Sequence, residues 1–418
     1  MRVTNGATYR NFTTGANNVH ARLIKSYNKV SSGEAYESAA ESPLSYYNSR
    51  RIDSQFQDVI TKQSLIKNVQ NRIYQQELGA RDVQGILSKA KDQIIYANTD
   101  TTNDTPLLSL RDDLLQKQHE IVDALNAQYQ NFYVFGGNDI STPPFSLSGD
   151  GKTLTYTHTF PGEEKSTIFE MTLGITDDTT DPDTYGYSLK VTTPDNKTLE
   201  YDPKNSPDLS DPGDPGTQAV TKLLSAMKEQ GRIDIGYGSI RDHNTLLDTY
   251  TGGINVLTGL TSDAVKGGAG NLAATDAAGN KQPTDSKGKS IIDYLNESPL
   301  ALIGRSVQAI DKYVSRADGD EDRSKLNHLL SNTITDMVTT EHRVSAVYSD
   351  LGNKYRLLDD TADKLSLEKN NLTQQYTDVW GADPYESIVE MYNSQQAYNA
   401  ALKVGTNLMS SSLFDFMS

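Results

Sequence analysis

Two long stretches of the chain place an apolar residue at every seventh position. In the C-terminal stretch, residues 330–379, the row is Leu330, Met337, Val344, Leu351, Leu358, Leu365, Leu372 and Val379. Residues four positions further on form a second row that Glu341 and Lys369 interrupt. Rows at this spacing make one stripe along a helix, which is the pattern of a coiled coil. A helix of about fifty residues is about 75 Å long and needs a partner to bury its stripe.

The N-terminal half supplies a matching stripe. Its row is Ile52, Val59, Ile66, Ile73, Ala80, Leu87 and Ile94. Ser42-Pro43 is typical of a helix start, so the pattern predicts one helix from about residue 43 to 98. Gly79 and Gly85 each cost this helix about 1 kcal/mol relative to alanine. The unbroken row outweighs that cost, and we expect the two chain ends to form a long antiparallel helical coiled-coil rod whose core contains both rows.

Outside these stretches the apolar stripes are thinner, on a segment ending at Ser31-Ser32-Gly33 and on a last helix beginning near Pro384. Short, weakly amphipathic helices are marginal alone in water. An apolar tail at the C-terminus is exposed unless something covers it. We therefore expect both segments to become ordered on assembly with other subunits. The expected subunit contacts are Val19, Leu23, Val30, Ile388, Met391, Tyr398, Leu402, Leu413, Phe414 and Phe416.

The period changes to two between about residues 140 and 250. Alternating runs rich in threonine and aromatic residues lie at 154–160, 168–173, 187–191 and 233–237, which predicts strands. A helix is predicted near 219–230, and loops at 202–217 and 252–285. The fold class is therefore expected to be α+β, a helical rod with an inserted, mainly-β central domain.

Three domains follow from this pattern. Residues 1–42 with 385–418 are expected to form a terminal helical assembly domain, and residues 43–139 with 290–384 the helical rod. Residues 140–289 are expected to form an inserted, β-rich outer domain.

Composition excludes several classes of function. The chain has 39 basic and 55 acidic residues, a formal charge of -16. This acidity argues against a general affinity for nucleic acid. The absence of cysteine excludes disulfides, cysteine-ligated zinc and thiol catalysis. No apolar run approaches the ~18 residues of a membrane span, so we expect no membrane insertion. The N-terminus lacks the apolar core of an ordinary secretory signal, so an exported protein would need another route.

Candidate motifs for chemistry fail on inspection. The Gly-Lys-Ser at 288–290 has Pro283 where a phosphate-binding loop requires glycine. The acidic turn at 318–322 lacks the glycine and glutamate of a calcium loop, having Arg323 and Leu329 instead. The six histidines show no helical metal pair. We predict no catalytic residue, no metal and no cofactor, and a protein that is not an enzyme.

The two ends of the chain resemble the flagellin superfamily and, within it, the third hook-associated proteins of the hook–filament junction of bacterial flagella. The resemblance is carried by Met1-Arg2-Val3-Thr4 with Tyr9, the break at Ser31-Ser32-Gly33, Phe135-Gly136-Gly137 followed by Pro144-Phe145, Arg343 with Leu351-Gly352, Ala397-Tyr398-x-Ala400-Ala401-Leu402 and Ser412-Leu413-Phe414-Asp415. It covers about residues 1–145 and 290–418. Ala40-Glu41-Ser42-Pro43 departs from the family's Ser-Asp-Asp-Pro-like turn, and residues 140–290 show nothing diagnostic.

The resemblance implies a structural subunit of the flagellum that joins hook to filament. Members of this family are exported unfolded by the flagellar type III apparatus and form a ring of identical subunits outside the cell. Their neighbours are another hook-associated protein on the hook side and flagellin on the filament side. An export chaperone binds the C-terminal helices. The terminal helices line the inner tube, and the central domain faces outward.

Two alternatives remain open from the sequence. The chain could be a flagellin-like filament subunit, in which case the purified protein would form long filaments. It could instead be a secreted enzyme or adhesin that acts through its central domain. That hypothesis predicts a concave pocket with perturbed carboxylates between residues 140 and 290.

Overall fold

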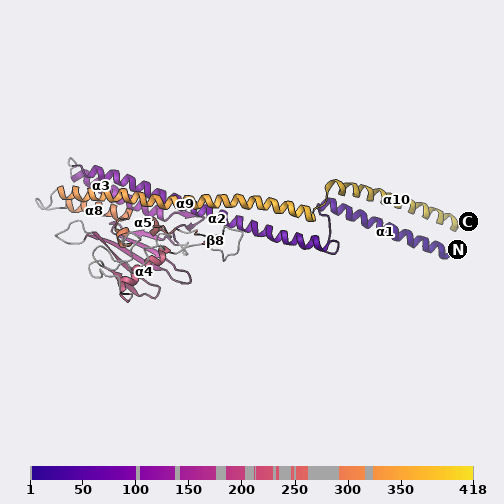
Figure 1. Cartoon of the computed structure of the whole chain (residues 1–418), viewed down its shortest axis with the longest axis horizontal. Coiled ribbons are helices and arrows are strands. Elements are labelled where there is room, and N and C mark those ends of the chain that lie inside the picture. Colours follow the sequence, from indigo (N-terminus) through magenta and orange to yellow (C-terminus); the bar gives the residue numbers. More distant parts are fainter. Residues whose placement is uncertain are drawn as a thin grey trace. The chain divides into compact units, whose positions relative to one another are not determined.

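The computed structural model forms two compact units, shown in Figure 1. The terminal unit contains Met1–Leu65 with Thr361–Ser418, and the central unit contains Ile66–Asp360. The structure describes residues 2–99, 104–136, 142–175, 185–202, 211, 213–228, 232–234, 246–248, 251–261, 291–315 and 323–417.

The terminal unit is helical. It contains α1 (Arg2–Ser32), α10 (Pro384–Met417), the start of α2 (Pro43–Ala97) and the end of α9 (Arg323–Trp380). The predicted helix over 43–98 is confirmed, and α2 begins at Pro43 as the Ser-Pro sequence indicates. In Figure 1, α1 and α10 lie side by side.

Short capping interactions end α1 and start α10. Gly33 adopts a left-handed φ of 73° and donates its N–H to the carbonyl of Lys29, at 3.1 Å. Glycine tolerates this conformation better than other residues, so α1 ends here. The carboxylate of Asp383 accepts from the N–H groups of Tyr385 and Glu386, at 2.8 and 3.1 Å. Asp383 is thus the N-cap of α10, with Pro384 at its first position.

Within the central unit, α2 and α9 run antiparallel in a constant register. Each step forward along α2 is matched by an equal step backward along α9, and four contacts between the two helices have this same offset. These are Gln70 with Asp359 at 3.0 Å, the rings of Tyr74 and Tyr355 at 5.8 Å, Arg81 over the ring of Tyr348 at 5.5 Å, and Asn98 with Ser331 at 3.0 Å. Such a register brings facing heptad rows together along the pair.

Gly79 has a packing reason in this unit. A Cβ atom at this position would lie 2.9 Å from the ring of Phe135 and 3.1 Å from the carbonyl oxygen of Ala124. Ala124 belongs to α3 (Asp104–Leu125), so glycine permits α3 and the buried Phe135 to approach α2. The residue that sequence analysis counts as a cost is therefore a site of close packing.

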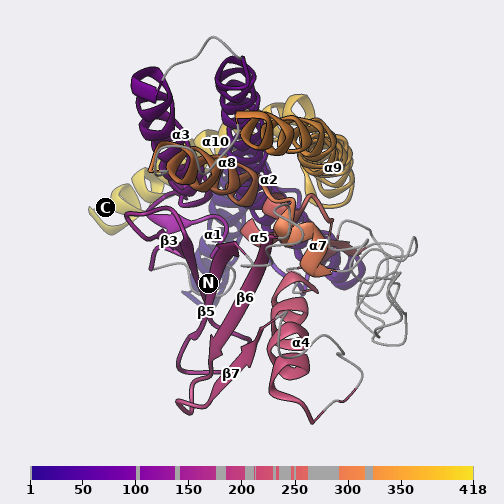
Figure 2. The ribbon, with the colours of Figure 1, turned by 90° about the vertical axis from the view of Figure 1, so that its left-hand side faces the viewer.

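The outer part of the central unit is an antiparallel meander. Its five strands pair in sequence order: β3 (Phe145–Leu147), β4 (Thr153–His158), β5 (Thr167–Ile175), β6 (Tyr185–Thr192) and β7 (Thr198–Tyr201). Burial alternates along β4 and β7, as expected for strands with one covered face. Helix α4 (Pro215–Lys228) packs on β6 and β7 (Figure 2).

The described residues of the central unit also form smaller elements. They are the strands β1 (Gln128–Tyr129), β2 (Phe132–Tyr133), β8 (Arg232–Asp234) and β9 (Leu246–Asp248), and the helices α5 (Gly253–Thr258), α7 (Ile291–Asn296) and α8 (Pro299–Val314). Helix α8 packs against α3 and contacts β5. The predicted α+β class is confirmed.

Two buried glutamines connect helices of the central unit to backbone segments elsewhere in the unit. The side chain of Gln118 donates to the carbonyls of Gly151 and Leu300, at 3.2 and 2.9 Å. Gln76, in α2, donates in the same way to the carbonyls of Val134 and Thr251, at 2.7 and 3.2 Å. Each amide therefore binds backbone from segments far apart in the sequence, which stabilises one arrangement of this unit.

One loop prediction is partly wrong. The stretch 252–285 was expected to contain only loops and small turns, but α5 is helical and every residue in it is buried. Ile254, Val256 and Leu257 supply the apolar side chains, and six residues are too few to show a period. Most of the predicted loop over 202–217 and residues 262–285 lie outside the described residues. The division into three domains stays a prediction.

Candidate functional site

The helix pair α1 and α10 is held together by polar and aromatic contacts. The rings of His20 and Tyr398 lie 5.1 Å apart, and the hydroxyls of Ser26 and Ser394 are 3.2 Å apart. Next to the two serines, the Lys29 ammonium lies 3.1 Å from the Glu390 carboxylate. Exposed ion pairs contribute little stability, since solvent screens them.

Almost nothing is buried in this helix pair. Among the side chains described in α1 and α10, at residues 6–32 and 384–406, the buried ones are Ser26 and Ser387. Large apolar side chains are instead exposed on both helices: Tyr9, Ile24, Tyr27, Tyr385, Ile388, Val389, Tyr392, Leu402 and Val404. A group of exposed apolar side chains on the surface of a folded protein indicates an interaction surface. We call these nine residues the terminal apolar surface.

The residues predicted as subunit contacts fall into three groups. Five are half-buried: Val19, Leu23, Val30, Met391 and Tyr398. Ile388 and Leu402 are 41% and 50% exposed. Leu413, Phe414 and Phe416 lie in α10, and their side chains are outside the described residues. Their role as contacts between subunits stays a prediction.

The residues predicted as rod core are all buried, none more than 5% exposed. In α2 they are Ile52, Val59, Ile66, Ile73, Leu87 and Ile94, and in α9 they are Leu330, Met337, Val344, Leu351, Leu358, Leu365 and Leu372. Burial of each large aliphatic side chain is worth about 1.5–3 kcal/mol. These rows therefore differ sharply from the terminal helix pair.

An aromatic cluster that no sequence pattern predicts lies where the two chain ends meet in the terminal unit. Trp380 is 6% exposed, and the rings of Tyr36 and Tyr46 lie 5.4 and 5.8 Å from it. Its carbonyl accepts from the N–H of Ala35 at 2.8 Å, and the N–H of Ala382 donates to the carbonyl of Gly33 at 2.9 Å. The signal available was that Trp380 is the only tryptophan in the chain.

Arg343, one of the residues behind the resemblance, joins α9 to the loop between α7 and α8. Its guanidinium pairs with the Glu297 carboxylate, donates to the Glu297 carbonyl at 3.0 Å and lies 5.1 Å above the ring of Tyr294. Gly259 approaches closely, since a Cβ there would collide with the Cβ and backbone of Arg343. Arg343 thus has a packing and hydrogen-bonding role within the central unit.

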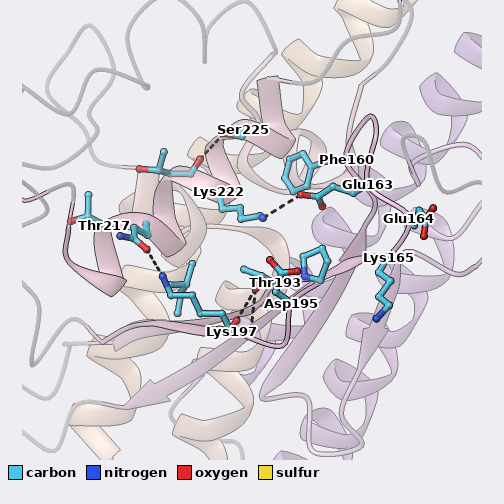
Figure 3. A pocket seen from close by; sticks show the side chains of 14 residues that line it. Phe160, Glu163, Glu164, Lys165, Thr193, Asp195, Lys197, Thr217, Lys222 and Ser225 are labelled. Atoms are coloured by element: carbon cyan, nitrogen blue, oxygen red, sulfur yellow. Dashed lines mark hydrogen bonds and ion pairs between the residues drawn. The ribbon is translucent and has the colours of Figure 1, made fainter.

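An open groove lies in the outer part of the central unit (Figure 3). Its volume is about 1010 Å³. One wall is α4, and the other comes from the β4–β5 and β6–β7 turns. It is lined by Phe160, Glu163, Glu164, Lys165, Thr193, Pro194, Asp195, Lys197, Leu199, Thr217, Gln218, Thr221, Lys222 and Ser225. The enzyme-or-adhesin hypothesis expected a concave pocket with perturbed carboxylates between residues 140 and 290. The groove matches the first of these two features, and the second stays a prediction.

The described part of the chain offers little for metal chemistry or membrane insertion. It contains no group of three or more histidine, aspartate or glutamate side chains that could hold a metal ion. Among the described helices, none combines the length and the apolar character that crossing a membrane requires.

Burial raises the pKa of Tyr187 to about 12. The Tyr187 hydroxyl is hydrogen-bonded to Ser298 near Arg305, and Tyr187 does not line the groove.

No family model and no curated protein sequence matches this chain. Its structure is similar to a protein described as a flagellar hook-associated protein from Vibrio parahaemolyticus, with a TM-score of 0.45, 12% identity, and coverage of 82% of this chain and 100% of the other. It is similar to FlgL of Xanthomonas campestris, with a TM-score of 0.37, 13% identity, and coverage of 78% and 98%. It is also similar to the flagellar junction protein FlgL of Legionella pneumophila, with a TM-score of 0.35, 12% identity, and coverage of 74% and 99%. Likeness at these TM-scores does not by itself assign a function to the chain.

Proposed function

We propose that this protein is a structural subunit of the bacterial flagellum that forms the junction between hook and filament. The observation that carries the proposal is the terminal helix pair, which exposes the terminal apolar surface and buries no apolar side chain in its described part. A surface of this kind requires covering, and neighbouring copies of the chain supply it when the helices assemble. The sequence features at both chain ends support the same family.

The proposal assigns different tasks to different parts. The α1–α10 pair contacts neighbouring subunits, with the predicted contact residues on it. The α2 and α9 rows form a coiled-coil rod that is already folded in the free subunit. The chain leaves the cell unfolded through the flagellar type III apparatus, with a chaperone on its C-terminal helices, and becomes part of the extracellular flagellum. Its neighbours are a second hook-associated protein and flagellin. No catalysis is involved.

A first experiment measures hydrogen exchange of the full-length monomer. The amides of α1 and α10 should exchange at least about a hundredfold faster than those of α2 and α9, because few buried contacts hold the terminal pair closed. In the polymerised or cross-linked assembly, α1 and α10 should become protected. Equal protection of α1 and α9 in the monomer would remove the basis of the proposal.

The flagellin-like alternative is tested with the same sample. Electron microscopy of the purified protein at high concentration separates short rings or oligomers from long filaments. Long filaments would favour a filament subunit over a junction subunit. A variant lacking residues 1–32 and 384–418 serves as the control, because it should keep the cooperative unfolding of the central unit and lose all self-association.

A further inference from the structure

The contacts within the α1–α10 pair are too weak to fix the position of these two helices. In its described part the pair buries two side chains, those of Ser26 and Ser387. The helices contact each other through single rings, hydroxyls and an ion pair. Exposed polar contacts of this kind contribute little stability. The contacts that position α1 and α10 must therefore lie where these helices join α2 and α9 in the terminal unit.

Two short segments meet at this point as an antiparallel bridge. Residues 33–36 follow α1, and residues 380–382 lead from α9 to α10. Glu34 pairs with Gly381, and one backbone hydrogen bond lies on either side of this pair, at 2.8 and 2.9 Å. We call residues 33–36 and 380–382 the clasp. It connects the end of α1 to the start of α10 through the backbone, so the two helices lie together at this end.

Trp380 connects the clasp to the start of α2. Its side chain is 6% exposed, and its ring lies 5.4 Å from the ring of Tyr36 and 5.8 Å from that of Tyr46. Tyr36 belongs to the clasp, and Tyr46 belongs to the first turn of α2. Contacts between aromatic rings are favourable beyond the area that they bury. One side chain at the end of α9 thus contacts both the segment after α1 and the start of α2.

The backbone of the clasp tolerates little change at Gly381. The N–H of Gly381 donates to the carbonyl of Thr377 in the last turn of α9, at 2.8 Å. A Cβ atom on Gly381 would lie 2.5 Å from that same oxygen, so any other residue must displace the backbone. The side chain of Asn28 donates to Glu37 at 2.9 Å, which also holds the loop after the clasp against α1. The segment after α1 is therefore held from two sides.

We propose that the clasp is a rigid joint, with Trp380 as its positioning residue. It fixes the direction of the α1–α10 pair relative to the start of α2 and the end of α9 within the terminal unit. An open clasp would leave α1 and α10 helical but free to point in many directions. Each association with a neighbouring copy would then have to order the pair, and this loss of entropy weakens binding. The step to neighbouring copies rests on the proposed function, whereas the rigid joint does not.

The first part of the test measures the joint in the dilute monomer. The chain has no cysteine, so spin labels attach at two introduced cysteines, Asn18→Cys on α1 and Gln57→Cys on α2, both at exposed positions. Double electron–electron resonance should give one narrow distance distribution. Trp380→Ala and Gly381→Ala should each broaden it at least about twofold, because the joint becomes a hinge. Tyr47→Ala is the matched control, since Tyr47 is 66% exposed on the same part of α2.

Two further measurements distinguish positioning from a general loss of stability. Trp380 is the only tryptophan of the chain, so its emission should shift to longer wavelength in Gly381→Ala if the clasp opens. Trp380→Phe keeps a buried ring and should restore most of the narrow distribution. In concentrated protein without labels, the two open-clasp variants, Trp380→Ala and Gly381→Ala, should need about tenfold more protein to assemble than the natural chain. The unfolding of the central unit should stay unchanged.

The outcomes separate the joint from the junction function. Circular dichroism identifies any variant that fails to fold, and Gly381→Ala decides the matter if Trp380→Ala does so. The rigid joint is overturned if the natural chain gives a broad distribution, if both open-clasp variants keep the narrow one, or if Tyr47→Ala broadens it equally. If the joint is rigid but the natural chain does not assemble, the junction function fails and the joint stands. If the open-clasp variants assemble as well as the natural chain, the role of the clasp in assembly is overturned and the junction function stands.

Discussion

The α2–α9 pair and the α1–α10 pair are both made of long antiparallel helices from opposite ends of the chain, yet they differ in what they bury. In the heptad rows, thirteen predicted core residues are at most 5% exposed. In the described part of α1 and α10, the buried residues are two serines. Helical spacing of apolar residues is thus not sufficient for a core. The apolar stripe must also be wide enough, and another element of the protein must pack against it.

The difference in partners is visible within each unit. In the central unit α3 packs against α2 at Gly79, and α8 packs on α3. The α2–α9 pair is therefore covered by further helices. The α1–α10 pair makes its contacts through single residues such as His20 and Tyr398. A two-helix contact of this kind leaves the outward sides of both helices open. We infer that the missing layer comes from other subunits.

The largest expected effect contrasts one substitution in each pair. Ile73→Ala should lower the free energy of unfolding by about 2–5 kcal/mol, because a fully buried side chain is replaced by a cavity. Leu402→Ala, on the terminal apolar surface, should change it by less than about 0.5 kcal/mol. Denaturant unfolding followed by circular dichroism measures both. Equal effects would show that the terminal pair has a core of its own in the free subunit.

A smaller effect is expected from two glycines on the same helix. Gly85→Ala should stabilise the protein by about 0.4–1 kcal/mol, because nothing lies within 4 Å of the added methyl group. Gly79→Ala should instead destabilise it by about 1–3 kcal/mol through overpacking against Phe135 and the backbone of α3. Thermal unfolding of the two variants measures the sign of each change. Stabilisation by Gly79→Ala would contradict the close approach of α3.

The smallest expected effect is a pH dependence in the terminal unit. The Lys25 ammonium, 2.8 Å away, hydrogen-bonds Glu41 and holds the pKa of that carboxyl below its ordinary value of 4.5. A lowered pKa adds stability above pH 4.5 that is lost as the pH falls below it. Thermal unfolding between about pH 7 and about pH 3 should therefore lose slightly less stability in Glu41→Gln than in the natural protein. Identical pH profiles would show that the bridge does not form in solution.

Much of the helical framework could be predicted from the sequence because heptad rows report burial directly. Ile73 and Leu358 could be assigned to a core from spacing alone. The strands at 154–160 and 168–173 were found for the same reason, since alternation follows from one covered face. These elements carry their own periodic pattern, so knowledge of the tertiary fold was not required.

The remainder depends on contacts between segments far apart in the sequence. The role of Trp380 requires that residues 33–36 lie beside it, and nothing in the local sequence indicates that pairing. The groove is formed by the β4–β5 turn, the β6–β7 turn and one face of α4, so no single sequence motif predicts it. The short helix α5 shows no period, because it is buried on all sides.

The constant register of α2 and α9 also has a kinetic consequence. Gln70 and Asp359 are 289 positions apart in the sequence, and Asn98 and Ser331 are 233 apart. Pairing such distant segments requires closing a very long loop before the buried rows stabilise it, and proteins with many long-range contacts fold slowly. We expect refolding of the α2–α9 pair to be slow compared with formation of the isolated helices. If the chain is exported unfolded, as proposed, slow pairing of these helices would help, because the chain would remain unfolded for longer.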